Sequence, residues 1–249
     1  MSKQWILLAG ASRGIGLETA RLLLSEGYSV IASARHVDSI GENFSGLGED
    51  RLKIIPFDFS RVEELEDFAS QVTKLVGGIS GMLYSAGMQK TLPLAQSKFS
   101  AAEEIFRVNT FAAFEMVRLF AKKGAYSADG ASFVLMSSLA AREGALGKAL
   151  YGASKGALEG FIPAAAAELA ARKIRLNAVT LGVVRTDMSM EFIGKMSEEQ
   201  RKLLEGGYPL GMGEPEDAAL FIVYLLSEKA RWITGQTFVL DGGHMARGC

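Results

Sequence analysis

The chain has 249 residues, of which 49% are hydrophobic and 22% charged, and its formal net charge at pH 7 is −1. A near-neutral chain without basic clusters is not expected to bind nucleic acid as its main partner. No apolar run reaches the ~18 to 20 residues of a membrane span, so no membrane association is expected.

Cysteine and histidine are scarce. The single cysteine, Cys249, excludes an internal disulfide and fits a reducing cytoplasm. His36 and His244 are too few and too far apart to indicate a metal site. The N-terminal apolar stretch is too short for a signal peptide and is better explained as a first strand.

Short, continuous apolar runs alternate with helical patterns along the whole chain. Such runs are typical of parallel strands buried on both faces. They occur at residues 5–9, 28–34, 52–57, 81–85, 131–137, 174–180 and 237–240. Helical stretches begin near Gly14, Val62, Ala101, Leu150 and Glu216. The alternation predicts an α/β fold, a doubly wound parallel sheet of the Rossmann type in a single domain over residues 1–249, with ligands at the carboxyl ends of the strands.

The first strand is followed by a glycine-rich turn, Gly10-Ala11-Ser12-Arg13-Gly14-Ile15-Gly16, and then by a helical pattern. Such a turn lets the backbone approach a diphosphate, and the helix N-terminus supplies unpaired N–H groups and a partial positive charge. The spacing differs from the common G-x-G-x-x-G pattern, so the flanking strand and helix carry much of the argument. The turn predicts a dinucleotide site.

Tyr151 and Lys155 are four residues apart, which places both on one face of a helix. A phenol has a pKa of roughly 10. A neighbouring positive charge favours the phenolate and is expected to lower that pKa towards the range of general acid/base catalysis. Ser138 lies thirteen positions upstream, and its hydroxyl is a candidate to hold an oxygen on which charge develops. Alone, a Tyr-x-x-x-Lys pair arises by chance in many helices.

Together these motifs resemble the short-chain dehydrogenase/reductase family, in its single-domain branch, over nearly the whole chain. Further landmarks in family order are Asp58-Phe59, Ser85-Ala86-Gly87, Asn109, residues 181–186 and Asp241-Gly242-Gly243. The resemblance implies cofactor contacts at Gly10, Ser12, Arg13, Ile15, Gly16, Arg35, Asp58, Phe59, Ser85, Ala86, Gly87, Tyr151, Lys155, Gly182, Val184 and Thr186.

The resemblance also implies the roles of the reactive residues. Tyr151 protonates the carbonyl oxygen during hydride transfer, and Ser138 orients and polarises that oxygen. Lys155 lowers the pKa of Tyr151 and bonds the nicotinamide ribose, while Asn109 holds a water that links Lys155 to solvent. Two alternatives stay open: Ser137 in place of Ser138, although the family gap of thirteen favours Ser138, and a purely structural role for Asn109.

The second predicted strand ends in Ala34-Arg35, without the acidic residue that would bind the ribose diol of NAD. Arg35 and Arg13 suit a 2′-phosphate, because guanidinium–phosphate pairs are charge-assisted and often bidentate. They favour NADP(H). Asp38 is the objection, since it is near enough in sequence to reach a ribose, although capping a short helix is the alternative.

Three positions depart from the family pattern. Tyr84-Ser85 replaces the usual asparagine pair, so the side-chain contacts that this pair makes near the adenosine are not expected to be the same here. Leu181 replaces the usual proline before Gly182. Pro163 falls inside the helix that carries Tyr151, and a kink is expected between Glu159 and Pro163.

The substrate is the least determined feature. Motifs at residues 185–188 and 208–217 are similar to those of 3-oxoacyl-carrier-protein reductases, and residues 187–213 are expected to cover the substrate. Alternatives are a keto-sugar or secondary-metabolite carbonyl reductase and a non-catalytic NADP(H)-binding sensor. An extended-branch epimerase would need a further substrate domain. The alanine-rich stretch 164–167 permits close helix packing, so a homodimer or homotetramer is expected.

Overall fold

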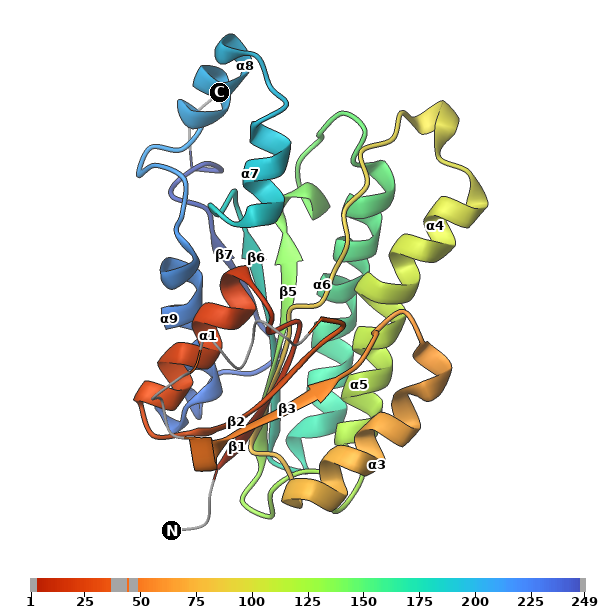
Figure 1. The fold of residues 1–249 in the computed structure, drawn as a ribbon, viewed down its shortest axis with the longest axis vertical. Coiled ribbons are helices and arrows are strands. Elements are labelled where there is room, and N and C mark those ends of the chain that lie inside the picture. The colour runs from red at the N-terminus through yellow and green to blue at the C-terminus, as the bar shows by residue number, and fades with distance from the viewer. Residues whose placement is uncertain (1–3, 37–43, 45–48, 247–249) are drawn as a thin grey trace.

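A computed structural model describes residues 4–36, 44 and 49–246 of the chain. Seven parallel strands form one sheet in the order β3-β2-β1-β4-β5-β6-β7 (Figure 1). They are β1 (Trp5–Ala9), β2 (Ser29–Ala34), β3 (Leu52–Pro56), β4 (Gly81–Tyr84), β5 (Ala131–Ser138), β6 (Ile174–Leu181) and β7 (Thr237–Leu240). All seven predicted strands are confirmed, and no end is displaced by more than one residue. The strand order reverses between β1 and β4, which is where ligands bind in open sheets of this kind.

Helices cover both faces of the sheet (Figure 1). One face carries α1 (Gly14–Ser25) and α9 (Pro215–Leu226), and the other carries α3 (Leu65–Val76), α4 (Phe99–Phe106), α5 (Ala112–Phe120) and α6 (Ala149–Ala170). Short 3₁₀ helices lie at Glu49–Arg51, Val62–Glu64, Leu94–Gln96, Leu139–Ala141 and Glu228–Ala230. Two helices, α7 (Asp187–Ile193) and α8 (Glu198–Glu205), stand beyond the carboxyl ends of the strands.

Because both faces are covered, the two sides of each strand enter different hydrophobic cores. In β5, Phe133 and Leu135 pack in the core that includes α5 and α6, while Val134 packs in the core that includes α1 and α9. Each fully buried side chain of this size contributes about 1.5–3 kcal/mol to folding. The sheet is thereby a rigid support for the residues at its carboxyl edge.

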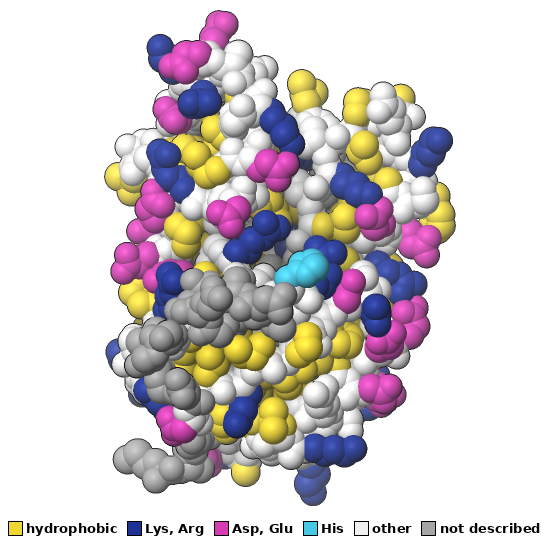
Figure 2. Space-filling view, viewed as in Figure 1, with side chains coloured by type: hydrophobic (Ala, Val, Ile, Leu, Met, Phe, Trp, Pro, Cys, Tyr) yellow, Lys and Arg dark blue, Asp and Glu magenta, His cyan; other side chains and the backbone are white. Residues whose placement is uncertain are grey.

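The long helix α6 continues through Pro163 without ending there. A proline lacks the N–H that would bond the carbonyl of Glu159 one turn earlier. The expected kink stays a prediction, and the segment from Tyr151 to Lys155 lies upstream of the proline. In the part of the chain that the structure describes, no helix is long and apolar enough to cross a membrane. On the face seen in Figure 2, acidic and basic side chains are interspersed.

Candidate active site

The sequence landmarks meet at the carboxyl edge of the sheet. Gly10 directly follows β1, Ser85 follows β4, Gly182 follows β6, and Ser138 is the last residue of β5. The structure places these four landmarks at strand ends, as predicted, and their binding roles stay predictions. Their convergence makes this edge the candidate site.

Two glycines of the first turn are required by close backbone packing. Gly10 has a φ of +96°, and a Cβ on it would lie 2.6 Å from the backbone nitrogen of Ala86. A Cβ on Gly16 would lie 2.1 Å from the carbonyl oxygen of Gly10. α1 starts at Gly14. The side chain of Arg13, the N-cap residue, makes no capping hydrogen bond, and the first turn of the helix contains no acidic residue. Its leading N–H groups therefore suit an anionic ligand, as a diphosphate would require.

The same turn lies against the segment after β6. A Cβ on Gly14 would lie 3.1 Å from Cγ2 of Thr186, which caps α7 through its side chain. Gly14 and Thr186, both expected to contact the cofactor, therefore come from distant parts of the chain. Val184, between β6 and α7, forms an isolated bridge with Gly213. A Cβ on Gly182 would lie 2.9 Å from the Tyr208 ring, so a glycine is needed there.

The departures from the family pattern have structural explanations. The Ser85 hydroxyl lies 2.8 Å from the carbonyl oxygen of Ala9 and 3.1 Å from that of Gly10. The Tyr84 hydroxyl donates to the carbonyl of Val108 at 2.6 Å. Ser85 therefore ties the end of β4 to the end of β1, and Tyr84 ties β4 to the residue before Asn109. Leu181 is buried and extends β6, pairing with Ser138.

At the end of β2, Arg35 is exposed, and so is Arg13 in the glycine turn. Burial opposes ionisation of Asp58, but hydrogen bonds from Ser60 and the charge of Arg35 lower the pKa of its carboxyl below the ordinary value. Phe59 is buried, with its ring 5.7 Å from that of Tyr84, which leaves its backbone for a ligand. Asp38 lies outside the described residues.

The Ser138 hydroxyl faces the Tyr151 phenol closely enough to influence the pKa of that phenol. Burial raises the pKa of Tyr151, and the Ser138 hydroxyl acts in the opposite direction. Ser137 is not in this position, because its hydroxyl lies 2.8 Å from the carboxylate of Glu159. The alternation of side chains along β5 thus favours Ser138 over Ser137 as the partner of the phenol.

Lys155 is only 5% exposed. Its ammonium donates to the carbonyl of Met136 at 2.8 Å, and burial lowers its pKa to about 8. The pKa of Tyr151 is raised in this structure, and the expectation that Lys155 lowers it stays a prediction. The physical reason for the raised pKa is that desolvation of the phenol outweighs the other influences on it.

Asn109 lies in a π-helical turn, Arg107–Phe111, between α4 and α5. Its Oδ1 accepts from the Met88 N–H at 2.8 Å, and its amide nitrogen donates to the Ser154 hydroxyl at 3.0 Å. A Cβ on Gly87 would lie 3.3 Å from Asn109 Oδ1 and 3.5 Å from Lys155 Nζ. These three residues therefore converge, and π-helical turns are frequent at functional sites. The expected water stays a prediction.

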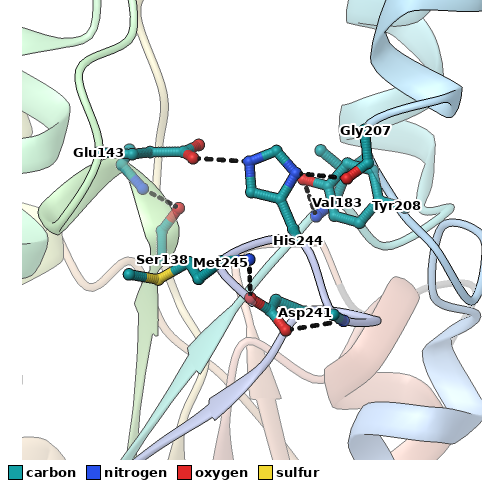
Figure 3. A network of polar contacts seen from close by, with 10 residues as sticks. Ser138, Glu143, Val183, Gly207, Tyr208, Asp241, His244 and Met245 are labelled. Atoms are coloured by element: carbon teal, nitrogen blue, oxygen red, sulfur yellow. Dashed lines mark hydrogen bonds and ion pairs between the residues drawn. The ribbon is translucent and has the colours of Figure 1, made fainter. Parts of the chain in front are cut away.

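One cluster at the site went unnoticed in the sequence. The His244 ring nitrogens lie 2.8 Å from the Gly207 carbonyl and 2.9 Å from the Glu143 carboxylate, and the ring stacks on Tyr208 at 4.6 Å (Figure 3). His244 thus ties the segment after α8 to the segment after Ser138. No local pattern signals such a contact.

A cavity of about 610 Å³ lies between the segments that follow β4 and β5. Its lining consists of Thr91, Leu92, Pro93, Leu94, Ala140 and residues 143–149. Lys148, within the lining, donates to the Thr91 hydroxyl at 2.6 Å and places its ammonium 4.4 Å from the centre of the Phe192 ring. Phe192 belongs to α7, so Lys148 connects the cavity lining to that helix.

A doubly wound parallel sheet with a glycine turn at a helix N-terminus, and with serine, tyrosine and lysine at the same edge, defines an oxidoreductase of the dinucleotide-binding α/β class. Comparison with known proteins agrees. A family model described as enoyl-(acyl carrier protein) reductase matches residues 10–245. The chain belongs to the short-chain dehydrogenase/reductase family.

Curated relatives span nearly the whole chain. The carbonyl reductase family member 4 of Xenopus laevis is 31% identical over 235 residues, which cover 94% of each protein. The 3-oxoacyl-(acyl-carrier-protein) reductase FabG of Thermotoga maritima is 30% identical over 243 residues, covering 95% of this chain and 96% of that protein.

Solved structures share the fold. A short-chain dehydrogenase/reductase from Brucella melitensis has a TM-score of 0.88 at 28% identity, covering 97% of this chain and 96% of the other. ElxO, solved with NADP bound, has a TM-score of 0.89 at 25% identity, covering 98% of this chain and 100% of the other.

Proposed function

We propose that the protein is an NADP(H)-dependent oxidoreductase that interconverts a ketone and a secondary alcohol, with Tyr151 as proton donor and acceptor. One observation carries the proposal: Ser138 and Tyr151 stand at the same sheet edge as the Gly10–Gly16 turn, with Lys155 buried and, like Asn109, beside Gly87. A protein that only senses a dinucleotide has no need of this phenol.

The residues present fit a nicotinamide dinucleotide. The glycine turn and the N-terminus of α1 would hold the diphosphate, and Gly87 opens space beside Lys155 Nζ and Asn109 Oδ1 for the ribose. Arg13 and Arg35 would bind a 2′-phosphate, which favours NADP(H) over NAD. The NADP-bound structure of ElxO supports this preference by relationship.

The cofactor, when bound, supplies or accepts the hydride. The protein supplies the proton: the Tyr151 hydroxyl donates to the ketone oxygen, while the Ser138 hydroxyl bonds the same oxygen and stabilises the charge that develops on it. Lys155 would keep the phenol ionisable once its ammonium lies close to the reacting groups, and Asn109 would hold the water through which the proton is replaced.

The cavity between the segments that follow β4 and β5 favours a ketone with an apolar substituent. Most of its lining side chains are apolar, and Leu94 and Leu146 are 77% and 99% exposed at its edge. A keto sugar would need several hydrogen-bonding partners there. The carbonyl reductase and 3-oxoacyl reductase relatives have names consistent with such a substrate, free or bound to a carrier. Residues 187–213, which include α7 and α8, would cover it.

The assembly and the location are proposed from the surface of α6 and from the cysteine content. We propose a homodimer or homotetramer formed through the alanine-rich part of α6, where Ala164 and Ala167 are exposed. The single cysteine suits the reducing cytoplasm.

Replacement of Tyr151 by phenylalanine tests the function. Tyr151→Phe is expected to reduce turnover by about 10³-fold or more, because it removes the proton donor, while the dissociation constant for NADPH changes less than about threefold. Turnover is measured by NADPH absorbance with a panel of acyl thioesters, keto sugars and simple ketones, and binding by NADPH fluorescence. Retained turnover in the variant would remove Tyr151 from the acid role.

A further inference from the structure

Glu159 lies one helical turn beyond Lys155 on α6, and its carboxylate receives hydrogen bonds from three elements of the site. The Ser137 hydroxyl of β5 donates to it at 2.8 Å, and the Thr180 hydroxyl of β6 donates at 2.5 Å. Nε of Arg142 donates to the second carboxylate oxygen at 2.8 Å. The Glu159 side chain is 15% exposed, so these bonds are largely shielded from water.

The first consequence concerns Ser138. Ser137 directly precedes it, and Arg142 follows it after the short 3₁₀ helix Leu139–Ala141. One carboxylate therefore holds the Ser138 segment at both ends. Charge-assisted bonds of this kind are stronger than neutral ones and impose geometry.

The second consequence concerns α6. Pro163 has no N–H, so the carbonyl of Glu159 lacks the helical bond that residue 163 would otherwise supply. Where α6 is weakest, the Glu159 side chain therefore ties it to β5 and β6. The Ser137 hydroxyl also lies 3.3 Å from the carbonyl oxygen of Lys155, which extends the tie towards the reactive lysine.

We propose that Glu159 is a positioning residue that sets the distance between Ser138 on β5 and the Tyr151–Lys155 turn of α6. It does not touch the reacting atoms. It acts through Ser137 and Arg142, which fix the Ser138 backbone, and through its own place on the helix. The inference rests on the proposed function, since positioning matters only where Tyr151 exchanges a proton.

The test compares Glu159→Gln with Glu168→Gln, a control on the exposed side of the same helix. Glutamine keeps the size of the side chain. Its amide NH₂ is a hydrogen-bond donor, and it would face one of the groups that now donate to the carboxylate: the Arg142 guanidinium or the Ser137 and Thr180 hydroxyls. We expect kcat to fall about tenfold or more in Glu159→Gln with less than a twofold change in NADPH affinity, and no change in the control. An unchanged kcat in a folded Glu159→Gln variant overturns the inference.

A second measurement separates positioning from loss of folding. The Ser138 hydroxyl acts to lower the pKa of Tyr151, so displacing Ser138 is expected to move the pH profile of alcohol oxidation to higher pH in Glu159→Gln. Ser137→Ala should reproduce this displacement of the pH profile. The double variant, Glu159→Gln with Ser137→Ala, should lose no more activity than the less active of the two single variants. Additive losses, or a pH profile that stays in place while kcat falls, contradict the proposal.

The outcomes also distinguish the two proposals. If Tyr151→Phe retains turnover, the proposed function fails, whatever Glu159→Gln does. If Tyr151→Phe is inactive and Glu159→Gln matches the control variant in kcat and pH profile, only the positioning role fails.

Discussion

The buried lysine has a cost in stability that can be measured. Lys155 is 5% exposed, and no carboxylate in the described part of the chain pairs with its ammonium. Burial lowers its pKa from the ordinary 10.5 to about 8, which corresponds to about 3 kcal/mol of penalty for the charged form at pH 7. A substitution that removes the charge would also lose the hydrogen bond from Lys155 to the Met136 carbonyl, and this loss would offset about 1 kcal/mol of the gain.

Replacement of Lys155 by methionine is therefore expected to stabilise the cofactor-free protein at pH 7 by about 2 kcal/mol, while abolishing turnover. For a domain of this size, that gain raises Tm by about 4 to 8 °C. The assay is thermal or urea unfolding followed by circular dichroism. Lys123→Met, at an exposed position, serves as the control and should change Tm little.

The pH dependence gives the sign of the effect. A lysine whose folded pKa is lowered pays its full penalty below pH 8 and loses that penalty as pH rises towards 10.5, where the unfolded chain also deprotonates. The wild-type protein should therefore gain stability relative to the variant across this range. A variant less stable than wild type at pH 7, or a difference that does not shrink by pH 10.5, would refute the reasoning.

Three further substitutions test other parts of the site. Arg35→Asp should raise the KM for NADPH about 100-fold and the KM for NADH less than about threefold. The substitution replaces a cationic ligand of the 2′-phosphate by an anionic side chain that repels it. Equal effects on the two KM values would contradict the NADP(H) preference. Gly16→Ala should destabilise by about 3 kcal/mol or more, because its Cβ would lie 2.1 Å from the Gly10 carbonyl oxygen. Gly160→Ala, with nothing within 4 Å, is the matched control and should be neutral or stabilising in thermal unfolding. His244→Ala should raise the substrate KM about fivefold, which corresponds to about 1 kcal/mol, because it releases Gly207 from the segment after Ser138. An unchanged KM would show that the contacts of His244 with Gly207 and Glu143 have no role in substrate binding.

Much of the fold was predictable because strands buried on both faces require continuous apolar runs. Leu7 and Ile31 lie in one core, Leu8 and Ala32 in the other, so both sides of β1 and β2 are buried against apolar side chains. The glycine turn was likewise recognisable, because its strand, turn and helix are contiguous. α7 was not predicted, since its stability comes from a Thr186–Ser189 capping box rather than an apolar pattern.

The arrangement of the reactive groups depended on packing between distant segments. Tyr151 and Lys155 were recognisable by their spacing, but the bond of Lys155 to Met136 and the raised pKa of Tyr151 follow from burial, which spacing does not encode. Glu143 and His244 are 101 positions apart and meet only when the sheet brings their segments together. Local patterns record which face of a segment is buried. Desolvation and hydrogen-bond partners arise only when several segments enclose the same group, which is why the identity of the site could be foreseen and its electrostatics could not.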